Sequence, residues 1–169
     1  MSGILTDEEN AHLSVLKKNG FLIKFKKSDM KNVTKNGGIA ILCGDGDVSI
    51  YDHHKAIISK RAHSIKLFGG PLLLCPSFKK YNKHAVSAIL ENISWGKSAK
   101  ETKTFFIYFH YPCGVATLFD HSMDDVLKMA PEATKCIQDF FDPKKIITFF
   151  HVKRRNKGGK IEQNSYILK

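Results

Sequence analysis

Short runs of apolar residues, rich in β-branched and aromatic side chains, recur along the chain between polar stretches that contain turn residues. Runs of this length and composition predict buried β-strands. Four of them occupy residues 38–42, 64–68, 104–109 and 146–152. After the last run, a basic stretch containing Gly158 and Gly159 leads to an apolar end at 165–168, so we expect a hairpin there.

Segments with a helical pattern lie between the predicted strands. Thr6 is followed by Glu9 at the spacing of a capping box, which predicts an N-terminal helix over residues 6–18. Further helices are predicted over residues 48–60, 77–92 and 115–141. We expect Ser77 to cap the second of these and Pro131 to interrupt the third.

Strands that alternate with helices are typical of an α/β fold, in which helices flank a mostly parallel central sheet. The chain has 169 residues, of which 43% are hydrophobic, enough for one sizeable core. It contains no internal repeat, linker or low-complexity tract. We therefore interpret residues 1–169 as a single α/β domain.

The sequence has no run near the roughly 18 uncharged apolar residues that a membrane span requires, and its N-terminus does not resemble a secretory signal. We therefore expect a cytoplasmic protein without a membrane partner. Its four cysteines should then be reduced, because cytosolic thiols are kept reduced, and either metal ligation or burial explains them better than disulfides.

The net charge of +11 favours anionic partners or substrates through long-range attraction. The basic residues are nevertheless spread along the chain, without the motif or the interleaved aromatic residues of a nucleic-acid reader. The densest basic segment, residues 152–160, falls at the predicted hairpin turn, where a solvated surface explains the charge. Nucleic acid is therefore not the expected partner.

Metal-ligating residue types follow two of the predicted strands. Cys43 and Asp45 come directly after the strand 38–42, and His110 and Cys113 come directly after the strand 104–109. The carboxyl ends of parallel strands meet at one edge of a sheet, where loops converge. Zinc prefers thiolate and imidazole ligands, so we predict a zinc site formed by Cys43, His110 and Cys113.

The fourth ligand position has two possible states. A catalytic zinc keeps it open, whereas a structural zinc fills it with a protein ligand such as Asp45. The alternative to a metal site is simple burial, because cysteine is among the most buried residue types. We interpret Cys75 and Cys136 in that way.

The pattern Cys43-Gly44-Asp45, with His110, Cys113 and Gly114 after a later apolar strand, resembles the β-class carbonic anhydrases. The resemblance spans about residues 38–168. It implies that zinc is held by two cysteines and one histidine and that zinc-bound hydroxide converts CO2 reversibly to bicarbonate, with Asp45 as the catalytic residue that orients it. It also implies a homodimer or a higher homo-oligomer.

The chain departs from that family in the loop after the second strand, where Leu67-Phe68-Gly69-Gly70 lacks the family's arginine-asparagine pair, and at two positions after Asp45. A serine and an arginine follow the family's aspartate, and the arginine pairs with it; here those positions are Gly46 and Asp47. Without the cation, direct coordination of Asp45 to the metal is favoured. The first hypothesis is a divergent carbonic anhydrase-like zinc enzyme in which another cation, such as Arg61 or Lys66, replaces the arginine. The second is a catalytically inactive zinc-binding homologue with a structural or partner-binding role.

Overall fold

The computed structural model describes residues 3–26, 37–45, 62–156 and 158–169. Its elements, in chain order, are α1 (Asp7–Lys18), β1 (Leu22–Lys24), β2 (Ile39–Cys43), β3 (His63–Leu67), the 3-10 helix η2 (Gly70–Leu74), α3 (Lys83–Lys100), β4 (Thr104–Tyr111), α4 (Gly114–Leu118), α5 (Met123–Phe141), β5 (Lys145–Arg155) and β6 (Ile161–Leu168). The four strands predicted from the apolar runs are all present. The predicted helix over 48–60, together with Gly46, Asp47 and Arg61, lies outside the described residues.

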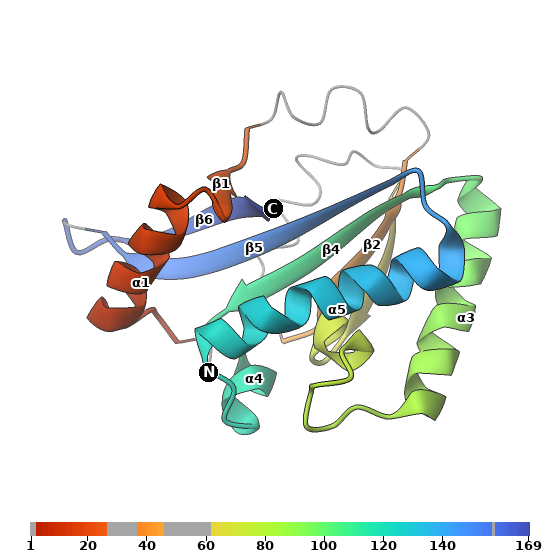
Figure 1. Cartoon of the computed structure of the whole chain (residues 1–169), viewed down its shortest axis with the longest axis horizontal. Coiled ribbons are helices and arrows are strands. Elements are labelled where there is room, and N and C mark those ends of the chain that lie inside the picture. The colour runs from red at the N-terminus through yellow and green to blue at the C-terminus, as the bar shows by residue number, and fades with distance from the viewer. Residues whose placement is uncertain (1–2, 27–36, 46–61, 157) are drawn as a thin grey trace.

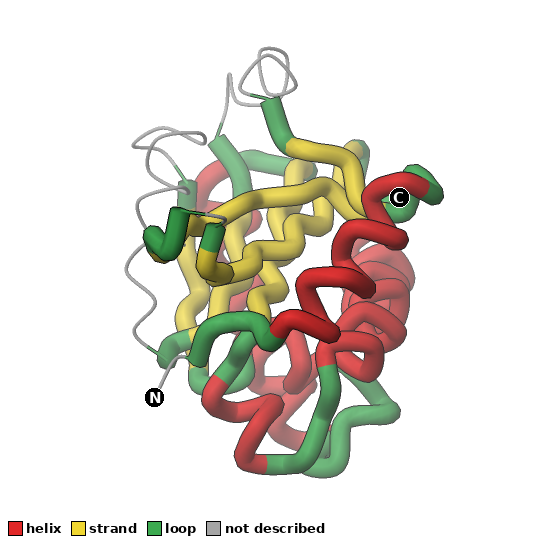
Figure 2. Tube along the Cα trace, turned by 90° about the vertical axis from the view of Figure 1, so that its left-hand side faces the viewer, coloured by secondary structure: helices red, strands yellow, loops and turns green. Residues whose placement is uncertain are grey.

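The strands form a six-stranded sheet in the order β1-β6-β5-β4-β2-β3. Strands β3, β2, β4 and β5 are mutually parallel, whereas β6 is antiparallel to β5 and β1 is antiparallel to β6 at one edge of the sheet. Helices α1 and α5 pack on the same side of this sheet (Figures 1 and 2). The predicted α/β class with a mostly parallel sheet flanked by helices is therefore confirmed.

The central strands are buried on both faces, which explains their nearly continuous apolar sequences. In β4, Phe105, Ile107 and Phe109 belong to the larger core cluster under the helices, whereas Phe106 and Tyr108 belong to a smaller cluster on the opposite face. The alternation of side chains along a strand divides them in this way. Strand β4 is therefore packed against an apolar cluster on each face of the sheet.

The predicted N-terminal helix is confirmed, including its cap. Thr6 Oγ1 accepts a hydrogen bond from the Glu9 amide at 3.2 Å, and the Thr6 amide donates to Glu9 Oε2 at 2.7 Å. These two reciprocal contacts satisfy backbone groups that the first helical turn leaves free.

The prediction for α3 was wrong at both ends. The helix begins at Lys83 behind an Asn82 cap, whose Oδ1 accepts from the His84 amide at 2.9 Å, and it continues through Gly96 to Lys100. Ser77 instead donates hydrogen bonds to the carboxylate of Glu132 on α5. Gly96 is required inside the helix because a Cβ there would lie 2.5 Å from the ring of His63. Close packing against β3 therefore explains a glycine that was expected to end the helix.

The predicted interruption at Pro131 was also wrong. Helix α5 runs unbroken from Met123 to Phe141 with Pro131 inside it, and the break falls earlier, between α4 and the Ser122 cap. A proline removes one helical hydrogen bond, but burial of residues along the same helix, including Leu127 and Ile137, offsets that loss.

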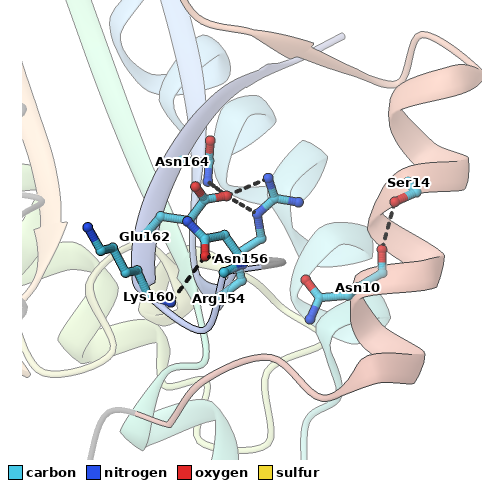
Figure 3. A network of polar contacts seen from close by, with 8 residues as sticks. Asn10, Ser14, Arg154, Asn156, Lys160, Glu162 and Asn164 are labelled. Atoms are coloured by element: carbon cyan, nitrogen blue, oxygen red, sulfur yellow. Dashed lines mark hydrogen bonds and ion pairs between the residues drawn. The ribbon is translucent and has the colours of Figure 1, made fainter.

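The hairpin between β5 and β6 is confirmed. Asn156 Oδ1 accepts hydrogen bonds from the amides of Gly158 at 3.0 Å and Lys160 at 3.1 Å, and these bonds fix the turn. Across the strands, Arg154 pairs with Glu162 through contacts of 2.6 and 2.7 Å (Figure 3). Part of the basic charge of the hairpin is therefore neutralised within the fold.

Candidate metal centre

Four side chains with metal-ligating atoms converge at the carboxyl ends of β2 and β4. Cys43 is the last residue of β2, and Asp45 follows two residues later. His110 lies near the end of β4, and Cys113 is the residue that precedes α4. Because β2 and β4 are adjacent and parallel, both ends reach the same edge of the sheet.

The ligating atoms of Cys43, Asp45, His110 and Cys113 all lie within 4.8 Å of one another. The two sulfur atoms are 3.9 Å apart. His110 Nε2 lies 3.2 Å from Asp45 Oδ2, and the same oxygen accepts a hydrogen bond from the Gly114 amide at 3.3 Å. The first turn of α4 thus holds the Asp45 carboxylate beside the imidazole.

Two of these separations, between the sulfurs and between His110 Nε2 and Asp45 Oδ2, are close to those of a tetrahedral zinc site. With Zn–S bonds of about 2.3 Å, two sulfur ligands of a tetrahedron lie about 3.8 Å apart, and a nitrogen and an oxygen ligand lie about 3.4 Å apart. The sulfur separation is also far from the roughly 2.05 Å of a disulfide, and both cysteines are free thiols. The spacing therefore fits coordination of one shared ion.

Burial of the donor atoms supports a ligand at this position. The residues Cys43, His110 and Cys113 are between 2% and 4% exposed. Within the described part of the chain, neither ring nitrogen of His110 makes a hydrogen bond of acceptable geometry. A buried ring nitrogen without such a partner is costly, and a metal ion would supply a partner for Nε2. The residues present therefore fit zinc.

The side chains perturb one another's protonation in the metal-free arrangement. Burial alone would lower the pKa of His110, but contact with Asp45 and Cys43 outweighs it and raises the pKa to about 9. The contact between the sulfurs lowers the pKa of Cys43 and raises that of Cys113. These shifts favour a thiolate at Cys43 beside a protonated His110 in the absence of metal.

The first residue of η2, Gly70, packs against the backbone of Cys43 at the end of β2. Gly70 has a φ of +49°, and a Cβ there would lie 2.5 Å from the backbone nitrogen of Cys43. Only glycine permits both this conformation and this approach. The cavity beside Cys43, His110 and Cys113 measures about 10 Å³, which is room for one atom-sized group rather than a substrate molecule.

The structure thus brings together all four residues singled out for the site, Cys43, Asp45, His110 and Cys113. Cys75 is buried elsewhere, donating to the carbonyls of Pro71 and Met129 at 3.3 Å, and Cys136 is half-buried on α5. Sequence reasoning did not identify the supporting roles of Gly70 and the Gly114 amide. The pair of glycines before Pro71 was the available signal for the first, and nothing in the sequence marked the second.

Lys66, one of the side chains considered as a replacement cation, lies on the edge strand β3. It is exposed and lines a depression between β3 and α3 together with residues such as Ile65 and Asn92. That depression is distinct from the small cavity at the metal-ligating residues.

No family model matches the sequence, and no curated protein matches it. Among solved structures, the chain is similar to the crystal structure of β-carbonic anhydrase isoform I from the protozoan Trichomonas vaginalis. The similarity covers 94% of this chain and 97% of that chain, with 16% sequence identity and a TM-score of 0.39.

No helix in the described part of the chain has both the length and the apolar character needed to cross a membrane.

Proposed function

We propose that the chain binds one zinc ion through Cys43, His110 and Cys113, with Asp45 beside the metal as the catalytic residue, and that this centre catalyses the reversible hydration of CO2 to bicarbonate. The convergence of four donor atoms within 4.8 Å is the observation that carries the metal-binding part. The sequence pattern that resembles the β-class carbonic anhydrases supports the reaction. The fold class is compatible with both.

Bound zinc would supply Lewis acidity, which makes a water molecule nucleophilic near neutral pH. The chain's own residues have separate tasks. Cys43 and Cys113 supply negative charge, and His110 supplies a neutral nitrogen donor. For this reaction Asp45 would accept a hydrogen bond from the reacting water rather than act as a ligand, and the Gly114 amide, which donates to its Oδ2 at 3.3 Å, holds the carboxylate beside His110.

The second candidate is a zinc protein without activity, in which the metal stabilises the fold or a partner-binding surface. Two observations favour it. Asp45 Oδ2 lies 3.2 Å from His110 Nε2, close enough for both atoms to bind the same ion. The cavity at the site has a volume of only about 10 Å³. A zinc ion with four protein ligands is typical of structural sites.

The resemblance also supports a cytoplasmic homodimer or a larger homo-oligomer, and we include this assembly in the proposal. Size-exclusion chromatography with light scattering measures it directly. A monomer at all accessible concentrations would contradict the assembly without affecting the metal centre.

The decisive experiment combines metal content with activity. We would purify the protein without added metal, quantify zinc per chain, and follow CO2 hydration by stopped flow. Cys113→Ser is expected to lose both zinc and hydration. Cys136→Ser is the matched control, because Cys136 lies on α5 and is not part of the four-residue cluster, so it should keep both.

The outcomes separate the two candidate functions. One zinc per chain, with hydration that disappears in Cys113→Ser, supports the enzyme. One zinc per chain, with hydration at the uncatalysed rate, contradicts the enzyme and favours the structural role. Absence of zinc would overturn both.

A further inference from the structure

Lysines gather at the amino ends of β4 and β5, the edge of the sheet opposite the metal centre. Helices α3 and α5 both end there, where the chain turns into these strands (Figure 1). The Lys103 carbonyl accepts hydrogen bonds from the amides of Lys144 at 3.0 Å and Lys145 at 3.3 Å, so the two turns lie side by side. We refer to residues 97–103 and 140–145 together as the lysine edge.

The lysine edge has a net charge of +3, because it contains five lysines and two acidic residues. The lysines are Lys97, Lys100, Lys103, Lys144 and Lys145. All but Lys97, which is half-buried, are exposed, and in the part of the chain that the structure describes none of the five forms an ion pair. The acidic residues, Glu101 and Asp142, are exposed C-caps of the two helices. Excess positive charge therefore faces the solvent.

Helix ends explain only part of this charge. Lysines in the last turn of a helix complement its dipole, and Lys97 and Lys100 occupy that position in α3. Lys103, Lys144 and Lys145 lie beyond the helix caps, and the dipole effect falls off within the last turn. The charge of these three lysines is therefore available to a partner.

An apolar side chain is exposed beside the lysines. Phe140, in the last turn of α5, is 58% exposed. Its ring lies 4.8 Å from the ring of Phe141, which in turn stacks on Phe105 of β4 at 5.3 Å. The Lys97 ammonium lies 5.9 Å from the centre of the Phe141 ring. This row of rings runs from the core to the surface and holds Phe140 next to the lysine edge's cations.

We propose that the lysine edge binds the surface of a membrane that contains anionic lipids. Clustered lysines are attracted to the phosphate and carboxylate groups of such lipids, and an exposed aromatic ring is favourable at the level of the headgroups. Phe140 favours a bilayer over duplex nucleic acid, because contact with backbone phosphates alone uses no apolar side chain. Lys103, Lys144 and Lys145 would contact the headgroups.

Peripheral contact of this kind does not require a membrane-spanning helix. The metal centre lies at the carboxyl ends of the same parallel strands, so it would face away from the bilayer. The inference is independent of the activity proposed for that centre.

The test is co-sedimentation of the full zinc-loaded chain with vesicles of phosphatidylcholine, either alone or with about 30% phosphatidylserine. We expect binding to the anionic vesicles to be at least about tenfold tighter than to the neutral ones, and to be lost between about 0.1 M and 0.5 M salt. The double variant Lys144→Glu, Lys145→Glu should weaken binding by about twentyfold or more.

The matched control is the double variant Lys80→Glu, Lys83→Glu. It changes the net charge equally at two exposed positions, but these lie at the start of α3, about 27 Å from its end. It should leave binding within about threefold, because charges this far away are screened.

Phe140→Ser should weaken vesicle binding by about threefold or more, because the ring no longer enters the interface. Trp95→Ser is its control, since Trp95 is 64% exposed on α3 but lies outside the row of rings, and it should bind as the wild type does. All variants change exposed side chains and should keep the wild-type melting temperature.

The proposal is overturned if the wild type does not bind anionic vesicles, if it binds neutral vesicles equally well, or if the two lysine double variants weaken binding equally. It is also overturned if Phe140→Ser binds as the wild type does. Tighter binding to a DNA duplex than to the vesicles, lost in Lys144→Glu, Lys145→Glu but retained in Phe140→Ser, would overturn it in favour of a nucleic-acid surface.

Discussion

The Sγ atoms of Cys43 and Cys113 lie 3.9 Å apart, although 70 residues separate the two cysteines in the chain. Parallel pairing of β2 with β4 produces this approach, because Cys43 ends β2 and Cys113 follows β4 at the same sheet edge. Two buried thiols at this spacing, beside His110 and Asp45, form a set of donors for one ion.

Zinc uptake should be strongly pH-dependent. In the metal-free protein the pKa of His110 is raised to about 9 and the pKa of Cys113 is also raised, so both groups carry protons at neutral pH. Zinc displaces both protons, and a higher pH therefore favours binding. The logarithm of the apparent affinity should rise by up to about two per pH unit between about pH 6 and 8. Competition with a chelator of known affinity measures it, and a slope near zero would contradict the protonated metal-free site.

Asp45→Asn should weaken zinc binding by about tenfold or more, because the carboxylate charge is lost from the ion's surroundings. Asparagine keeps a carbonyl oxygen for the Gly114 amide, so the loop should remain in place. We also expect azide to bind the cobalt-substituted variant more tightly than the cobalt-substituted wild type, seen in the visible absorption spectrum, because the fourth position becomes accessible. Asp139→Asn is the control, since Asp139 is exposed and pairs with Lys135. Equal azide affinity in the wild type and Asp45→Asn would show that Asp45 does not occupy the fourth position.

Gly70→Ala should destabilise the protein by at least about 2 kcal/mol, because the new Cβ meets the backbone of Leu42 and Cys43 at 2.5–2.7 Å and the positive φ is strained. The variant should also bind zinc more weakly, since the end of β2 has to shift. Urea denaturation and metal analysis measure the two effects. Gly114→Ala is the matched control near the same site: its Cβ would meet no atom within 4 Å, and it retains the amide that contacts Asp45. Similar losses in both variants would contradict this explanation.

Ser122→Ala should destabilise the protein by about 1 kcal/mol through loss of the cap of α5. Ser122 Oγ accepts from the Asp125 amide at 3.2 Å, and the Asp125 carboxylate accepts from Ser122 in return. Because the contact with Ser122 lowers the pKa of Asp125, this contribution is present above the ordinary aspartate pKa and is lost as the pH falls through the lowered value. Ser87→Ala removes only an exposed bond to the Lys83 carbonyl and should change stability by less than about 0.5 kcal/mol. Thermal denaturation of both variants at pH 7 checks the difference.

Local patterns predicted most of the elements, because strand burial and helix capping depend on residues that are close in the sequence. The apolar runs before Cys43 and His110 correspond to β2 and β4, and Thr6 with Glu9 corresponds to the cap of α1. The errors arose where contacts between distant segments decided the outcome. Ser77 has the chemistry of a helix cap, yet it donates to Glu132 on α5 at 2.6 Å, and Asn82 caps α3 instead.

The sequence by itself determined the donor types and their place after two buried strands, because ligand chemistry and strand composition are properties of short segments. Only the tertiary structure decided which strands are neighbours, and therefore that Cys43 and His110 belong to one cluster. It also decided the spacing of the sulfurs and the contact of Gly70 with β2. These features depend on how separate segments pack against one another, and packing is set by the volumes of all the side chains in the core rather than by any one motif.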